Sequence, residues 1–180
     1  MLPVRALAFA GPLAAIVFLT SVVGVAAGRG DDYSHAAHWM SELGARDQPH
    51  ALLFNLTGFM LPGLLIMAFA IGLSIALDTK RGPLFLALSG LAFMLIGTLP
   101  LRESPEALVN YLHSLVAHVS GLSFGCALVA FSRVFREHPK FVAIGRLTPC
   151  FMAFLILYPA SQIAWQEMGP MWQGWPQRVV

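Results

Sequence analysis

Five long runs of apolar residues dominate this chain. Short polar segments separate them, and the runs cover residues 6–28, 51–77, 84–101, 107–131 and 143–165. A helix rises about 1.5 Å per residue, so a run of about 20 residues crosses the roughly 30 Å hydrocarbon core of a bilayer. Charged residues make up only 11% of the chain, against about a quarter in soluble domains. The sequence therefore predicts an all-α, polytopic transmembrane bundle of five spans, which forms a single membrane domain over residues 1–180.

The charged residues at the ends of these runs sort to opposite sides. If the N-terminus is placed inside, the inside segments carry a formal charge of +5 and the outside segments −3, which together give the +2 of the chain. An excess of Lys and Arg marks the cytoplasmic side of a membrane protein, which predicts a cytoplasmic N-terminus. The pI of about 8.8 then reflects basic loops that meet anionic lipid, and nucleic acid is not an expected partner. The inside basic residues are Arg5, Lys80, Arg81, Arg133, Arg136, Lys140 and Arg146.

The first outside segment has a helical pattern of its own. Its apolar residues recur at three- and four-residue spacing, which predicts a short amphipathic helix lying on the outer surface over residues 33–43. These residues are Tyr33, Ala36, Ala37, Met40 and Leu43. In the second run, Pro62 predicts a tilt or a kink.

Short blocks along the chain match a known sequence pattern. They are Tyr33-Ser34-His35, Ser41-Glu42-Leu43-Gly44-Ala45, Leu53-Phe54-Asn55, Gly63-Leu64-Leu65, Gly97-Thr98-Leu99-Pro100, His113-Ser114 with His118, and Gly174-Trp175-Pro176-Gln177-Arg178-Val179. This pattern resembles the bacterial membrane proteins catalogued as domain of unknown function 998. The resemblance implies the bacterial cytoplasmic (inner) membrane and about six spans, hence a sixth helix after residue 180, but it implies no reaction. One departure follows Pro100, where the resemblance implies an aspartate and the chain has Leu101-Arg102-Glu103.

Most polar residues that could do chemistry are predicted to lie near the outer face. Those that could bind a ligand there are Asn55, Arg102, Glu103, Tyr158 and Gln162. The candidates for a catalytic role are His118, Glu42 and Ser114. Membrane lipid is the expected small-molecule partner, and other membrane subunits are possible protein partners.

Three histidines form the candidate metal site. His35 and His38 are three residues apart on the predicted surface helix and could face one ion, while His113 or His118 could supply a third nitrogen. Three protein ligands plus water make a catalytic zinc site, in which the water becomes a nucleophile. Glu42 or Glu103 could then move its proton. The alternative is that His35 and His38 are interfacial residues that contact lipid head groups.

His118 and Ser114 lie deeper, in the fourth run. An ionisable residue inside a membrane span is a functional candidate by default. The alternative for His118 is a neutral imidazole hydrogen-bonded to Asn55, Tyr158 or a backbone carbonyl. Ser114 could touch His118, but no Gly-x-Ser-x-Gly motif surrounds it. Haem is not expected within this chain alone, because His113 and His118 share one helix, although a site shared with another subunit stays open.

Three functions remain in order of preference. The first is a non-catalytic lipid-binding protein or accessory subunit with its polar site on the external face. The second is a membrane-embedded metal-dependent hydrolase or lipid-modifying enzyme that uses the histidine cluster. The third is a membrane subunit of a redox chain. The sequence does not decide whether the protein is an enzyme.

Overall fold

The protein is built from apolar helices. The computed structural model describes residues 4–30, 33–104, 107–139, 141–150 and 152–153, and no strand occurs among them. Three helical runs are long and apolar enough to cross a membrane: α1 (Val4–Ala27), the run from Ala51 to Ala76, and α5 (Leu108–Glu137). A further apolar helix, α4 (Arg81–Ile96), has 16 residues. The all-α prediction is confirmed, while five spans remain a prediction.

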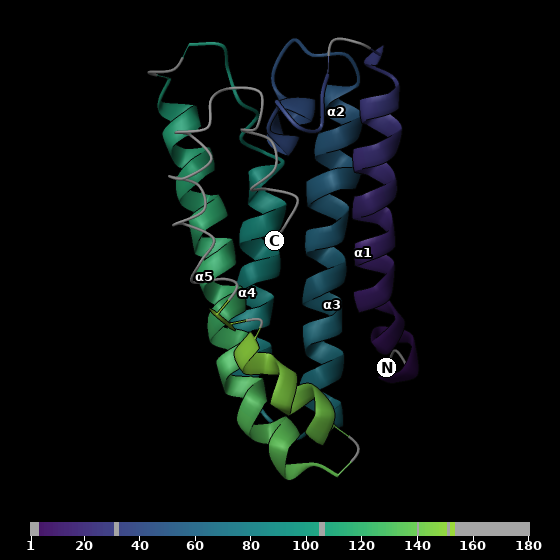
Figure 1. Ribbon diagram of the computed structural model, residues 1–180, viewed down its shortest axis with the longest axis vertical. Helices are drawn as coiled ribbons and strands as arrows, with labels where there is room; N and C mark the ends of the chain where they lie inside the picture. Colours follow the sequence, from purple (N-terminus) through teal and green to yellow (C-terminus); the bar gives the residue numbers. More distant parts are fainter. Residues whose placement is uncertain (1–3, 31–32, 105–106, 140, 151, 154–180) are drawn as a thin grey trace.

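The long helices lie side by side and alternate in direction (Figure 1). α3 (Leu61–Ala76) packs against both α1 and α4, and α4 packs against α5. We call the end of the molecule that holds Val4 the N-terminal end and the opposite end the cap end. The segment between α1 and α2 (Ala51–Phe54) and the segment that precedes α5 both lie at the cap end (Figure 1).

The second apolar run is one continuous helix with a wider turn inside it. α2 leads into a π-helix, η3 (Asn55–Met60), which leads directly into α3. Pro62 has no N–H and its ring crowds the carbonyl of the residue four positions earlier. The π turn moves the bonding by one residue, so that the Leu61 N–H donates to the Leu56 carbonyl. The proline predicted to disturb this run is thus accommodated by a π-bulge, a common solution inside helices.

Small residues let the helices approach closely. A Cβ added to Gly63 would lie 2.5 Å from the Gly90 carbonyl oxygen, so α3 and α4 cross backbone to backbone. Between α4 and α5, the hydroxyls of Ser89 and Ser120 lie 3.3 Å apart, and Ser120 also donates to the Ser89 carbonyl. Close approach of small residues and hydrogen bonds from serine hydroxyls are the contacts that join helices in lipid.

The outside of the bundle carries many large apolar side chains. Phe9 on α1 and Leu122 on α5 are each 72% exposed. Buried apolar residues form two clusters, one near the cap end around Leu43 and Phe54 and one nearer the N-terminal end around Ala70. An apolar exterior of this kind is expected of helices that face lipid.

Several predicted boundaries move. α4 begins at Arg81 rather than 84 and ends at Ile96 rather than 101, because residues 97–99 form a turn. α5 begins at Leu108 and runs to Glu137 rather than 131. The fifth predicted span, 143–165, is helical over 142–150, and most of its remainder lies outside the described residues.

The predicted amphipathic α-helix over residues 33–43 does not form. Residues 35–37 are a turn, and the segment ends in a short 3-10 helix, η2 (Met40–Gly44). Side chains occupy backbone donors here, since the Ser34 hydroxyl accepts from the Ala36 N–H and His38 Nδ1 accepts from the Ser34 N–H. Such local bonds compete with helix formation, which the apolar spacing alone does not reveal.

Candidate functional site

Two polar segments of the chain meet at the cap end. We call residues 33–50, which connect α1 to α2, the cap segment. The Arg46 N–H of the cap segment donates to the Leu101 carbonyl at 2.7 Å, so this segment lies against the loop that follows Pro100. The cap segment and the start of α5 were predicted to share one side of the membrane, and they lie at one end of the described structure (Figure 1).

Tyr33 anchors the start of the cap segment. Its ring is buried and packs in the apolar cluster near the cap end. The His38 ring stacks on it at 5.5 Å between centroids, and the His35 ring meets it edge-on at 5.2 Å. The Arg29 guanidinium carbon lies 5.5 Å from the ring centroid, a cation–π distance. The two histidines are therefore held by a tyrosine between them and belong to an aromatic cluster.

Glu42 and Asn55 fix the other end of the cap segment. Glu42 Oε1 accepts from the Trp39 N–H at 2.9 Å, which secures the start of η2. Asn55, buried in the π turn, donates its side-chain amide to the Gly44 carbonyl at 2.8 Å. A side chain on Gly44 would collide with this amide. Both polar residues thus hold backbone in place.

The polar residues around the loop between α4 and α5 also bond to backbone groups. His113 Nδ1 lies 2.7 Å from the Leu99 carbonyl and is buried against the end of α4. Asn110 accepts from the Arg102 N–H and donates to the carbonyls of Arg102 and Ser104. Arg102 and Glu103 themselves are exposed on this loop. Their backbone is therefore held firmly, while their side chains face outward.

Ser114 and His118 do not face the bundle. Both are exposed on α5, and His118 Nδ1 lies 2.6 Å from the carbonyl oxygen of Ser114 rather than from its hydroxyl. A backbone carbonyl was among the partners expected for His118, but this bond stays within one helix and joins no neighbouring helix among the described residues. Tyr158 and Gln162 lie outside the described residues.

The described residues do not assemble the predicted metal set. Within them, no three His, Cys, Asp or Glu side chains lie close enough together to hold one ion. His35 and His38 contact Tyr33, whereas His113 is turned toward Leu99. No step that uses zinc follows from this arrangement.

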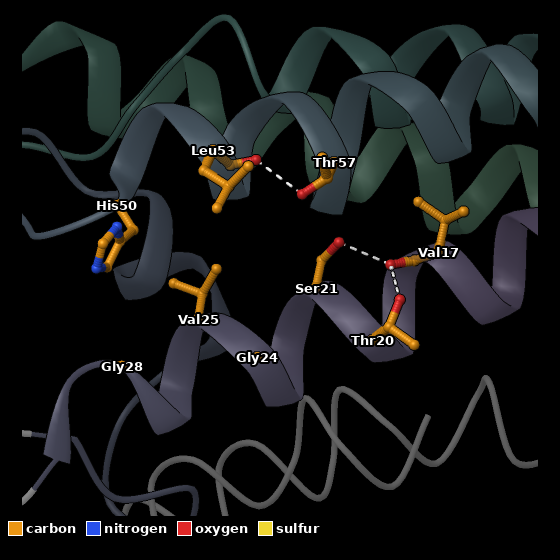
Figure 2. A pocket seen from close by; sticks show the side chains of 9 residues that line it. All are labelled: Val17, Thr20, Ser21, Gly24, Val25, Gly28, His50, Leu53 and Thr57. Carbon is orange, nitrogen blue, oxygen red and sulfur yellow. Dashed lines mark hydrogen bonds between the residues drawn. The ribbon is translucent and has the colours of Figure 1, made fainter.

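A groove lies near the cap end. It lies between α1 and the α2–η3 turns and has a volume of about 370 Å³. Figure 2 shows its residues along the two facing helices, with His50 near Gly28. We call it the α1–α2 groove. Its lining consists of Val17, Thr20, Ser21, Gly24, Val25, Gly28, His50, Leu53 and Thr57.

The hydroxyls of this groove are already bonded to their own helices. Ser21 donates to the Val17 carbonyl at 2.7 Å, and Thr57 donates to the Leu53 carbonyl at 2.8 Å. Thr20 donates to the Ile16 carbonyl at 2.8 Å. Figure 2 draws the bonds that the Val17 and Leu53 carbonyls accept. These hydroxyl donors are therefore satisfied within their own helices, and His50 lies at the cap end of the groove.

A comparison with known protein families shows which family this chain belongs to. The family model described as "Protein of unknown function (DUF998)" matches residues 12–180. The chain belongs to the DUF998 family. No curated protein and no solved structure matches it. With its apolar helices, this DUF998 protein is an integral membrane protein, and the family resemblance inferred from its sequence blocks is confirmed.

Two residues at the cap end of this DUF998 protein were not among the predicted site residues. His50 directly precedes an apolar run. This position at the boundary between a polar segment and a span is the only sequence signal that would have placed it at the membrane interface. Arg29 contributed only its charge to the predicted membrane orientation. In the structure it is half-buried, and its Nε has no hydrogen-bond partner among the described residues. Neither residue forms a motif with neighbours in sequence, because their surroundings come from other segments.

Proposed function

We propose that this DUF998 protein is a non-catalytic membrane protein that binds lipid at its cap end. The observation that carries the proposal is the α1–α2 groove, whose lining is mostly apolar and which has the exposed His50 at its cap end. An acyl chain fits walls whose hydroxyls are occupied, and His50 would contact the head group. The proposed orientation places the N-terminal end in the cytoplasm and the cap end outside.

The state of the polar residues supports a non-catalytic reading. Asn55 and Glu42 bond to the backbone of the cap segment, and His113 bonds to the end of α4. A general base must reach the proton that it abstracts, and a nucleophile needs an adjacent base. His118 contacts the Ser114 carbonyl rather than its hydroxyl, which favours a packing role for the pair.

The α1–α2 groove also suits a second occupant. Ser21, Gly24 and Gly28 recur at three- and four-residue spacing along α1, a pattern that permits a neighbouring helix to approach. A partner helix would make this protein an accessory subunit. We favour lipid because His50 places a polar group at the end of the groove nearest the membrane surface, as a phospholipid requires.

Photo-crosslinking tests the proposal. The purified protein is reconstituted in vesicles that contain a phosphatidylcholine with a diazirine in its acyl chain, irradiated, digested and analysed by mass spectrometry. We expect labels concentrated on residues 17–28 and 50–57, above the level on the exposed α5 side chains Leu115 and Leu122. Uniform labelling of all exposed faces would contradict the proposal. Crosslinks from the groove to a second polypeptide would replace lipid with a partner helix.

A further inference from the structure

A second groove lies at the opposite end of the molecule. It runs between α3 and α4, with a volume of about 420 Å³, and we call it the α3–α4 groove. It shares no residue with the α1–α2 groove. Its lining consists of Ala70, Ile71, Ser74, Lys80, Arg81, Pro83, Leu84 and Ala87.

The walls of the α3–α4 groove are apolar and face outward. Leu84 is 68% exposed and Ile71 is 55% exposed, on the surface where lipid would lie. The hydroxyl of Ser74 donates to the Thr79 carbonyl at 3.0 Å and is therefore occupied. The groove covers about one turn of α3 and about two turns of α4, or roughly 6–9 Å, which matches the upper part of an acyl chain.

Two cations stand at the N-terminal end of this groove. Lys80 and Arg81 are adjacent and exposed, and their side chains make no hydrogen bond or ion pair with the described residues. By contrast, Arg136 at the same end donates from Nε to the Gly145 carbonyl. Lys80 and Arg81 are thus charged groups at the end of the α3–α4 groove, and their side chains are available to bind an anion.

The start of α4 adds to this positive field. Arg81 is its first residue, no side chain caps it within the described residues, and its first turn holds no acid. Pro83 supplies no N–H, which leaves the Arg81 and Gly82 N–H groups at the helix start. The N-terminus of a helix favours negative charge. The helix start is fixed in place, because a Cβ on Gly82 would lie 2.8 Å from the Phe131 ring of α5.

We propose that the α3–α4 groove binds one anionic phospholipid from the leaflet at the N-terminal end. Its phosphate lies between Lys80 and Arg81, and one acyl chain lies against Ile71, Leu84 and Ala87. Cationic side chains beside an apolar groove complement a phosphodiester beside an acyl chain. This site is independent of lipid binding at the cap end, so either can fail without the other.

Lipid retention in native mass spectrometry tests this site. The full chain is purified from bilayers of equal phosphatidylglycerol and phosphatidylcholine, and the lipids that remain bound are counted. We expect wild-type protein to retain phosphatidylglycerol preferentially. Lys80→Gln/Arg81→Gln should weaken that retention by about tenfold or more, since each cation near a membrane surface contributes about 1 kcal/mol. The matched control, Arg133→Gln/Arg146→Gln, removes the same charge from exposed residues outside the groove and should retain it.

A variant that keeps both cations separates a phospholipid from a free anion. Ala87→Phe fills the groove beside them and should also lower phosphatidylglycerol retention, while inorganic phosphate should not displace the lipid. Equal loss in both glutamine pairs would reduce the effect to surface charge and overturn the proposal. A wild-type protein without preference for phosphatidylglycerol, or full displacement by inorganic phosphate, would overturn it too.

Discussion

The side-chain amide of Asn55 donates a 2.8 Å hydrogen bond to the carbonyl oxygen of Gly44. This bond joins the π turn of the second helical run to the end of η2, and both residues are buried. The cap segment therefore takes its position from inside the bundle. Asn55, which was predicted to bind a ligand, holds the backbone that covers the helices.

Removing this amide should loosen the cap segment. Asn55→Ala leaves the buried Gly44 carbonyl without a partner, a loss of about 1–3 kcal/mol. We expect faster hydrogen exchange in peptides covering residues 39–46. Asn110→Ala is the matched control, since Asn110 holds Arg102 and Ser104 and should loosen that loop instead. Unchanged exchange at 39–46 in Asn55→Ala would show that other contacts hold the cap segment.

The crossing of α3 and α4 should not tolerate a side chain. A Cβ on Gly90 would lie 2.8 Å from the Gly63 carbonyl oxygen, whereas a Cβ on Gly121 meets no described atom within 4 Å. Overpacking of this kind costs about 1–3 kcal/mol. Gly90→Leu should therefore lower the melting temperature in detergent, and Gly121→Leu should leave it nearly unchanged. Equal melting temperatures would contradict this crossing.

The proposed orientation is testable in intact cells. Cys126 and Cys150 are exposed and free, so both can be replaced by alanine to give a background for single cysteines. A membrane-impermeant thiol reagent should label Ser34→Cys without permeabilisation and Glu137→Cys only after it. Labelling of both positions from one side would be incompatible with the helix arrangement, and the reverse pattern would invert the orientation.

Metal content separates a structural role of the histidines from a catalytic one. His35 and His38 pack on Tyr33, and His113 lies against Leu99, so we expect no stoichiometric zinc in the purified protein. Elemental analysis checks this directly. One zinc per chain that is lost in His35→Ala/His38→Ala would establish the metal site that the sequence pattern suggested.

Helix positions were predictable because a long apolar run in lipid must satisfy its own backbone hydrogen bonds, and a helix does so within the run. The boundaries of α1 and of the Ala51–Ala76 run differ little from those predicted. The cap segment was not predictable from spacing, since the Ser34 hydroxyl and the His38 ring compete for backbone donors. Nor was the π turn, although Pro62 indicated a disturbance in that run.

The candidate site was only partly predictable from the sequence. Charge sorting placed the polar segments at one end, and the bond between Arg46 and Leu101 joins two of them. Which way a side chain points depends on helix rotation, so the outward position of His118 could not be read from its polarity. The α1–α2 groove is formed by segments distant in sequence, with His50 at its end, and carries no local motif.

Bound lipid at the α1–α2 groove is the most direct measurement of the central claim. Gly24 lines the groove and Gly121 lies on exposed α5, and a Cβ at either meets no described atom within 4 Å. Native mass spectrometry then counts the phospholipids retained by Gly24→Trp and Gly121→Trp. The proposal predicts that Gly24→Trp retains one lipid fewer than wild-type protein while Gly121→Trp retains the same number. Equal retention in both variants would contradict it.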